Sequence, residues 1–167
     1  MPHPPTADLE ALLRALQLGG VRFIVVGGAA AVIHGAPITT QDLDIVPEQT
    51  AENLARLLAV LVELGARFRP WRPDRDLTPT AEHLAGSGQL LLTTRVGPLD
   101  VLCRIHDGRG YVELAGRSRE IEDQGLHLQV LDLEALIEIK ASTGRKKDQL
   151  VVPILLALRA GGSDEKE

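Results

Sequence analysis

The stretch FIVVGGAAAVIHGAPITTQDLDIV, from Phe23 to Val46, carries the pattern that decides the fold of this chain. Its first four residues, FIVV, form an apolar run that predicts a buried strand. Gly27 and Gly28 follow directly, and the small residues from Ala29 to His34 predict a short helix. The pattern therefore predicts a strand, a glycine turn and a helix whose first N–H groups lie beside that turn, where such groups can bind phosphate.

The second half of the stretch predicts another strand, which follows the turn GAP at residues 35–37 and carries Asp42 and Asp44. Side chains two residues apart on a strand point to the same face, so the two carboxylates should project together. Paired carboxylates are the ligands that Mg²⁺ prefers in proteins. Thr39 and Thr40 either add hydroxyl donors to such a site or are only turn residues.

This order of features, Gly-Gly, a short helix and Asp-x-Asp, resembles the core signature of the nucleotidyltransferase (DNA polymerase β-like) superfamily. Within it, the chain is most similar to the small bacterial enzymes grouped with the AbiEii and MenT toxins. The resemblance covers residues 21–158 and extends to two further segments. LDVL at residues 99–102 resembles the strand that bears the family's third carboxylate, here Asp100. KASTGRKKD at residues 140–148 resembles the family's Lys…Arg-x-Lys-Asp motif.

The resemblance implies an α+β fold of two layers, a mixed β-sheet nucleotidyltransferase core with flanking helices. It also implies transfer of a nucleoside monophosphate from an NTP to an acceptor, with Mg²⁺ or Mn²⁺ as cofactor. For a toxin-type enzyme, the implied acceptor is tRNA or a protein, and the implied further partner is a cognate antitoxin. The implied metal ligands and catalytic carboxylates are Asp42, Asp44 and Asp100, and Lys140 is a further catalytic residue. The implied nucleotide-binding residues are Gly27, Gly28, Thr40, Arg145 and Lys147.

Two of these residues have alternative interpretations. Asp100 lies inside an apolar strand, where an ionised carboxylate is costly unless it is paired or liganded; alternatively, it faces solvent near the start of the strand. Lys140 shares a helical stripe with Leu136 and Ile137, which places it on the inward face of its helix. It either reaches triphosphate or a carboxylate across the cleft, or extends its ammonium group to the rim.

Length and composition are those of one globular domain. The chain has 167 residues, of which 44% are hydrophobic and 25% charged, and this size supports one core. We expect a single domain over residues 1–167, with residues 1–6 and 161–167 as loose tails. Aromatic residues make up only 2%, so aliphatic side chains must build the core. The net charge of −5 means that a nucleic-acid partner would need a local basic patch.

The sequence favours a cytoplasmic protein. The single cysteine, Cys103, excludes an internal disulfide and fits a reducing compartment. No apolar run approaches the roughly 20 residues that span a bilayer. The first residues, MPHPPTADLE, lack the basic and apolar regions of a signal peptide. We therefore expect no membrane partner.

Hydrophobic periodicity and turn residues predict the remaining elements. Helices are expected at residues 8–18, 50–64, 80–84, 110–117, 133–143 and 145–160. Strands are expected at residues 89–94, 99–105, 118–123 and 126–130. Pro153 is expected to kink the last helix. The family motif implies that Asp148, near the start of this helix, orients a Lys or Arg across the helix junction.

Two further features have a structural and a functional interpretation. The segment from Arg67 to Asp76 holds four arginines around Trp71. We favour a solvated loop here, and the alternative is a basic lip on which a base stacks. His34 stands between the glycines and the carboxylates, but a lone histidine without a second ligand is more often structural, so we favour that role.

Three functions compete for this pattern. The first is a metal-dependent nucleotidyltransferase of toxin type. The second is nucleotidyl transfer to a small molecule such as an antibiotic, which acidic cleft walls would favour if the drug is cationic. The third is a binding or antitoxin protein with this fold and little catalysis. The intact set Asp42, Asp44 and Asp100 argues against the third, because a degenerate site usually lacks one carboxylate.

Overall fold

A seven-stranded mixed sheet forms the centre of the computed structural model, which describes residues 6–69, 74 and 77–164. The strand order is β3-β4-β5-β2-β1-β7-β6. The strands are β1 (Phe23–Val26), β2 (Leu43–Pro47), β3 (Arg67–Phe68), β4 (Gln89–Thr94), β5 (Gly97–Leu102), β6 (Ser118–Asp123) and β7 (Leu126–Leu131). The helices are α1 (Leu9–Leu18), α2 (Gly27–Ile33), α3 (Ala51–Glu63), α4 (Ala81–Ala85), α5 (Tyr111–Ala115), α6 (Leu133–Ser142) and α7 (Lys146–Asp164). The expected α+β fold with a mixed sheet is confirmed.

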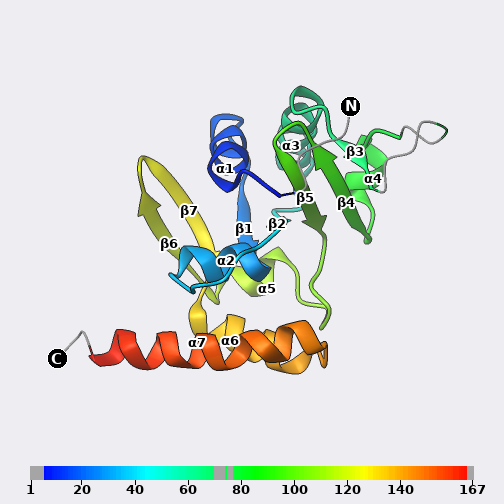
Figure 1. The fold of residues 1–167 in the computed structure, drawn as a ribbon. Coiled ribbons are helices and arrows are strands. Elements are labelled where there is room, and N and C mark those ends of the chain that lie inside the picture. Colours follow the sequence, from blue (N-terminus) through cyan, green and yellow to red (C-terminus); the bar gives the residue numbers. More distant parts are fainter. Residues whose placement is uncertain (1–5, 70–73, 75–76, 165–167) are drawn as a thin grey trace.

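Helices lie at two opposite ends of this sheet. Figure 1 shows α6 and α7 running together below the sheet, whereas α1 and α3 lie toward its opposite end. The short helix α2 follows β1 directly and leads back to β2. The C-terminal pair α6 and α7 thus lies on the side of the sheet where β1 ends and β2 begins. No helix in the described ranges is long and apolar enough to cross a membrane.

Local sequence explains where the helices begin and which faces they bury. The Asp8 carboxylate accepts a hydrogen bond from the Ala11 N–H and caps α1, and Thr50 caps α3 in the same way. The core is aliphatic, as the composition predicts. Its largest fully buried side chains are Leu12, Leu16, Ile24, Leu43, Ile45, Leu57, Leu61, Leu92, Leu99, Leu114, Leu131 and Leu136.

The register of three central strands sets the position of the candidate carboxylates. β1 and β2 are antiparallel, and Val26 at the end of β1 pairs with Asp44. β2 and β5 are parallel, and Asp44 pairs with Asp100. Directly paired residues of neighbouring strands point to the same face, so the sheet brings Asp44 and Asp100 side by side, next to the turn that follows β1.

Several boundaries differ from those expected. Asp42 lies in the bend before β2, which begins at Leu43, so only Asp44 of the pair is in a strand. The strand with Asp100 covers Gly97–Leu102, because its hairpin with β4 is tighter than expected. α7 continues through Pro153 to Asp164, so residues 161–164, expected as part of a loose tail, are helical. Trp71 lies outside the described residues.

Candidate metal and nucleotide site

Three carboxylates meet at the junction of β2 and β5. One oxygen from each of Asp42, Asp44 and Asp100 lies within 4.8 Å of the others. Asp44 and Asp100 come from paired strand positions, and Asp42 joins them from the bend before β2. The backbone of this bend is held by the Thr40 hydroxyl, which donates to the Asp42 carbonyl at 3.0 Å. The three acids that the sequence singles out are therefore brought together.

The two glycines after β1 allow this bend and strand to pack closely. A Cβ atom on Gly27 would lie 2.3 Å from Asp44 Oδ2, and the φ angle of Gly27 is +66°. A Cβ atom on Gly28 would lie 2.7 Å from Thr40 Oγ1. Real Cβ atoms do not approach other atoms this closely, so side chains at either position would displace the carboxylate site. The glycines therefore give Asp44 and Thr40 the room that they occupy.

The fold holds these carboxylates in an electrostatically unfavourable place. Burial raises the pKa of Asp44 to about 7, and the neighbouring Asp100 carboxylate adds to the rise. Burial also raises the pKa of Asp100, although the Arg69 guanidinium acts against it. Asp44 Oδ1 is buried and has no hydrogen-bond partner among the described residues. A buried oxygen without a partner within a set of three carboxylates fits a divalent cation.

Arg69 supplies a positive charge to the same cluster. Its Nη2 atom lies 2.6 Å from Asp100 Oδ1 and 3.9 Å from Asp42 Oδ2. The side chain of Asp100 is only 12% exposed and that of Arg69 26%. The favoured interpretation of this segment as a solvated loop is therefore wrong for Arg69, which turns inward because β3 pairs with β4 next to β5.

Lys140 faces this cluster from α6 and is fixed by Asp148 of α7. Lys140 Nζ donates to Asp148 Oδ1 at 3.2 Å, and the Thr143 hydroxyl donates to Asp148 Oδ2 at 2.7 Å. Arg145 Nε lies 3.0 Å from the same carboxylate. Burial alone would raise the pKa of Asp148, but the Thr143 hydroxyl and the Lys140 ammonium lower it below its ordinary value. Asp148 thus orients Lys140 across the helix junction.

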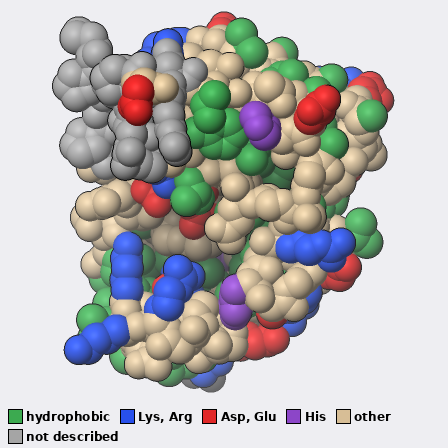
Figure 2. Space-filling view, turned by 90° about the vertical axis from the view of Figure 1, so that its right-hand side faces the viewer, with side chains coloured by type: hydrophobic (Ala, Val, Ile, Leu, Met, Phe, Trp, Pro, Cys, Tyr) green, Lys and Arg blue, Asp and Glu red, His purple; other side chains and the backbone are tan. Residues whose placement is uncertain are grey.

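A cleft of about 310 Å³ opens between the carboxylates and the C-terminal helices. All the predicted site residues line it: Gly27, Gly28, Thr40, Asp42, Asp44, Asp100, Lys140, Arg145 and Lys147. In Figure 2, acidic side chains are visible inside a hollow in the middle of this face, and Lys and Arg side chains gather below it. The cleft therefore has an acidic interior and a basic wall.

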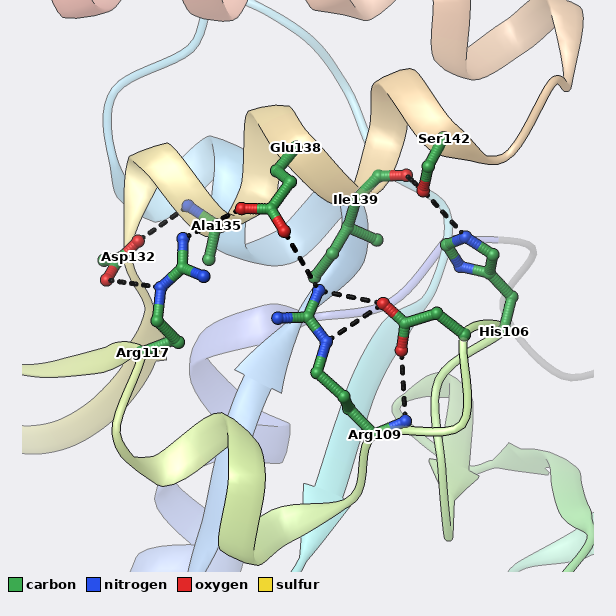
Figure 3. Close-up of polar contacts among 9 residues, drawn as sticks. His106, Arg109, Arg117, Asp132, Ala135, Glu138, Ile139 and Ser142 are labelled. Carbon is green, nitrogen blue, oxygen red and sulfur yellow. Dashed lines mark hydrogen bonds and ion pairs between the residues drawn. The ribbon is translucent and has the colours of Figure 1, made fainter.

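Ion pairs fix the loop that follows β5 to helix α6 (Figure 3). These ion pairs join the two sides of the cleft. Arg109 pairs with Asp107 within this loop at 2.8 Å and with Glu138 of α6 at 3.7 Å. Arg117 Nη2 lies 3.1 Å from the same Glu138. The loop therefore connects the strand that carries Asp100 to the helix that carries Lys140.

Three residues lining or near the cleft were not predicted as site residues. His106 lines the cleft, and its Nε2 lies 2.9 Å from the Ser142 hydroxyl of α6. Thr143 and Arg69 were also not predicted, although the four arginines near Trp71 were a signal for Arg69.

His34 Nε2 lies 2.8 Å from the Leu131 carbonyl, and His34 is not among the residues that line the cleft. This contact supports the structural role that the sequence favours for His34.

Known structures resemble the whole chain, although no family model and no curated protein matches it by sequence. LnuA, a lincosamide antibiotic adenylyltransferase solved with lincomycin bound, has a TM-score of 0.61 at 14% identity, over 93% of this chain and 99% of that chain. ANT(2″)-Ia, solved with adenylyl-2″-tobramycin, has a TM-score of 0.53 at 16% identity, over 95% and 97%. A Thermotoga maritima protein proposed to be a nucleotidyltransferase has a TM-score of 0.53 at 19% identity, over 89% and 90%.

The chain has the nucleotidyltransferase fold. Each match covers almost the full length of both chains, so the likeness includes the C-terminal helices as well as the sheet. In this chain, the nucleotidyltransferase fold places three carboxylates opposite Lys140. The narrower grouping with AbiEii and MenT toxins stays a prediction.

Proposed function

We propose that this chain is a metal-dependent nucleotidyltransferase, which transfers a nucleoside monophosphate from an NTP to an acceptor hydroxyl and releases pyrophosphate. The observation that carries the proposal is the convergence of Asp42, Asp44 and Asp100 within 4.8 Å at one end of a cleft. The buried, unpartnered Asp44 Oδ1 supports the same conclusion. The fold likeness to adenylyltransferases agrees with it.

The proposed roles follow from the positions of the side chains. Asp42 and Asp44 would hold the cation that carries the triphosphate, and Asp100 together with one of them would hold the cation at the acceptor hydroxyl. Two divalent cations, Mg²⁺ or Mn²⁺, would supply charge stabilisation for the attacking and leaving oxygens of an in-line displacement. The bond from the α-phosphorus to the oxygen that bridges to the β-phosphate breaks as the bond to the acceptor oxygen forms; pyrophosphate leaves, and the proton of the acceptor hydroxyl passes to solvent water.

The basic wall of the cleft would bind the triphosphate. Lys140 is oriented by the buried carboxylate of Asp148, which leaves its other two N–H donors for phosphate oxygens. Arg145 is 75% exposed, and it and Lys147 line the same cleft. Gly27, Gly28 and Thr40 line it beside the carboxylates, where glycines let a phosphate approach the backbone closely.

For the acceptor, we propose a macromolecule, tRNA or a protein, as for a toxin-type enzyme in the cytoplasm with a cognate antitoxin. Arg145 and Lys147, which line the cleft, give its rim a positive charge that would attract an RNA acceptor as well as the triphosphate. A second candidate is an antibiotic acceptor, which the likeness to LnuA and ANT(2″)-Ia favours. A cationic drug would bind less well beside this basic rim than beside an acidic one.

Label transfer tests the proposal directly. Each α-³²P-labelled NTP would be incubated with the protein, Mg²⁺ or Mn²⁺, and one of three acceptor sets: total RNA, bacterial proteins, or a panel of lincosamides and aminoglycosides. We expect label on one set, and none with the Asp42→Asn/Asp44→Asn double variant. The matched control is Asp8→Asn, which makes the same substitution at a helix cap. Transfer that survives in the double variant would show that the carboxylates are not the site.

A further inference from the structure

Arg69 is held in place by two hydrogen bonds to β4, one from its backbone and one from its guanidinium. Its backbone N–H donates to the Leu91 carbonyl at 2.9 Å, so the main chain is fixed to β4. Its guanidinium also donates from Nη1 to the Leu92 carbonyl. The remaining Nη2 group is directed at the carboxylates, 2.6 Å from Asp100 Oδ1 and 3.9 Å from Asp42 Oδ2. The sheet therefore sets the direction of this cation.

The Nη2 group of Arg69 lies beside the two carboxylates that a metal ion joining Asp42 and Asp100 would also contact. Nη2 lies close to Asp100 and within ion-pair distance of Asp42, and a divalent cation would need oxygens from both residues. A guanidinium and a divalent cation would compete for this place, because both bind oxygens of the same two carboxylates and carry the same sign of charge. Metal binding at this pair must therefore displace the Nη2 group.

We propose that Arg69 is an internal counter-ion that occupies the cation position between Asp42 and Asp100 and leaves it when a divalent cation binds there. This inference rests on the proposed metal-dependent function. It makes Arg69 the residue that sets the affinity of the acceptor-side metal position. Among the described residues, no cation is hydrogen-bonded to the buried Asp44 oxygen, so the two metal positions should differ in affinity.

A counter-ion and a permanent structural ion pair predict different results. If Arg69 only stabilises the fold, Arg69→Gln lowers stability equally with and without metal. If Arg69 is a counter-ion, Arg69→Gln lowers stability in metal-free buffer, and Mn²⁺ removes the difference because the cation replaces the lost charge. Metal should also bind more tightly to the variant, since no ion pair has to break. Hydrogen bonds to charged groups of this kind correspond to an affinity gain of about 10- to 100-fold.

The experiment is a Mn²⁺ titration without nucleotide. Calorimetry measures the affinity for Mn²⁺, and the thermal midpoint of unfolding measures the stability with and without the metal. The proteins are the wild type, Arg69→Gln and Arg95→Gln. Arg95 is the matched control, because it donates to the Glu63 carbonyl and is not among the residues that line the cleft. We expect at least about tenfold tighter binding in Arg69→Gln and unchanged binding in Arg95→Gln. Equal affinity of Arg69→Gln and wild type would overturn the counter-ion role while leaving the metal site intact.

A measurement on the wild type covers the case in which Arg69→Gln does not fold. Phenylglyoxal modifies accessible arginines, and mass spectrometry of the peptides reports the rate at each one. Saturating Mn²⁺ should increase the rate at Arg69 several-fold and leave Arg95 unchanged. A rate at Arg69 that Mn²⁺ lowers or does not change would overturn the counter-ion role. If Mn²⁺ binds neither to the wild type nor to the variant, with or without a non-hydrolysable NTP, the proposed function itself fails.

Discussion

Replacing Asp44 with Asn should stabilise the metal-free protein at alkaline pH, although it removes a group of the candidate site. The carboxyl of Asp44 has a pKa of about 7 in the folded protein, against an ordinary value of 3.8, because it is buried beside Asp100. Between pH 3.8 and about pH 7, the folded state therefore holds a proton on Asp44 that the unfolded chain has lost. Ionising Asp44 in the fold costs on the order of 4 kcal/mol, at about 1.4 kcal/mol for each pH unit between the two values.

The sign of the pH dependence follows from this difference. The stability associated with protonated Asp44 is fully present below the unfolded pKa of 3.8 and is lost as the pH rises through the folded pKa of about 7. Between pH 5 and pH 8.5, metal-free wild type should lose roughly 2–3 kcal/mol of unfolding free energy from this group. Asp100 shifts in the same direction, so it adds to the loss.

The Asn variant stays neutral at every pH and avoids the cost of ionisation. It still buries an amide at a position where one oxygen lacks a partner, which costs about 1–2 kcal/mol. At pH 5 it should therefore be no more stable than the wild type. At pH 8.5 it should be more stable by roughly 2–3 kcal/mol, which is the ionisation cost of about 4 kcal/mol less the amide cost of about 1–2 kcal/mol.

Urea unfolding in the presence of EDTA, followed by circular dichroism at pH 5 and pH 8.5, measures these differences. Asp8→Asn is the control, since Asn also caps helices well, and it should keep the pH dependence of the wild type. Adding Mg²⁺ with a non-hydrolysable NTP should then raise the melting temperature of the wild type but not that of Asp44→Asn. A metal-free wild type that is as stable at pH 8.5 as at pH 5, or an Asn variant with the same pH dependence, would refute the reasoning.

Three further substitutions test the support around the site. Lys140→Ala should weaken the binding of a non-hydrolysable NTP by about tenfold or more, measured by calorimetry on a variant whose circular dichroism is unchanged; equal affinity would place Lys140 outside the site. Asp148→Asn should lower the unfolding free energy by about 1–3 kcal/mol in urea, because it breaks a buried charged network; an unchanged urea midpoint would contradict this. Gly27→Ala should weaken Mn²⁺ binding, because its Cβ atom would push the Asp44 carboxylate. Gly65 has a similar φ of +65° and open space around it, so Gly65→Ala should lower stability and leave Mn²⁺ binding unchanged.

The central pattern of the fold could be predicted from sequence because it depends on local periodicity. An apolar run, two glycines and small residues specify β1 and α2, and residues two apart on an extended chain share a direction. This is why Asp42 and Asp44 were expected together, even though Asp42 lies just outside the strand. The pairing of Asp44 with Asp100 depends on the register of β2 and β5, which the sequence alone leaves open. The order of motifs in the resemblance supplied that link.

The position of Arg69 could not be predicted for a related reason. Four arginines lie within ten residues, from Arg67 to Asp76, and nothing in their spacing singles out Arg69. The pairing of Arg67 and Phe68 with β4 places Arg69 opposite Leu91, and Leu91 in turn pairs with Asp100 of β5. The end of α7 was also missed, because two glycines and a serine near its terminus have low helix propensity, yet the helix continues to Asp164.

Two buried aspartates of the same cleft show how a ligand-binding acid differs from a supporting one. Asp148 is 9% exposed and is fully partnered by Lys140, Thr143 and Arg145, and its pKa is lowered. Asp44 has a buried oxygen without a hydrogen-bond partner in the described part of the chain, and its pKa is raised. A fold gains stability from the first arrangement and loses it in the second, so the second persists only where something outside the chain completes it. For the proposed function, the unpartnered oxygen is where a cation would bind, and the satisfied carboxylate belongs to the residue that holds Lys140 opposite it.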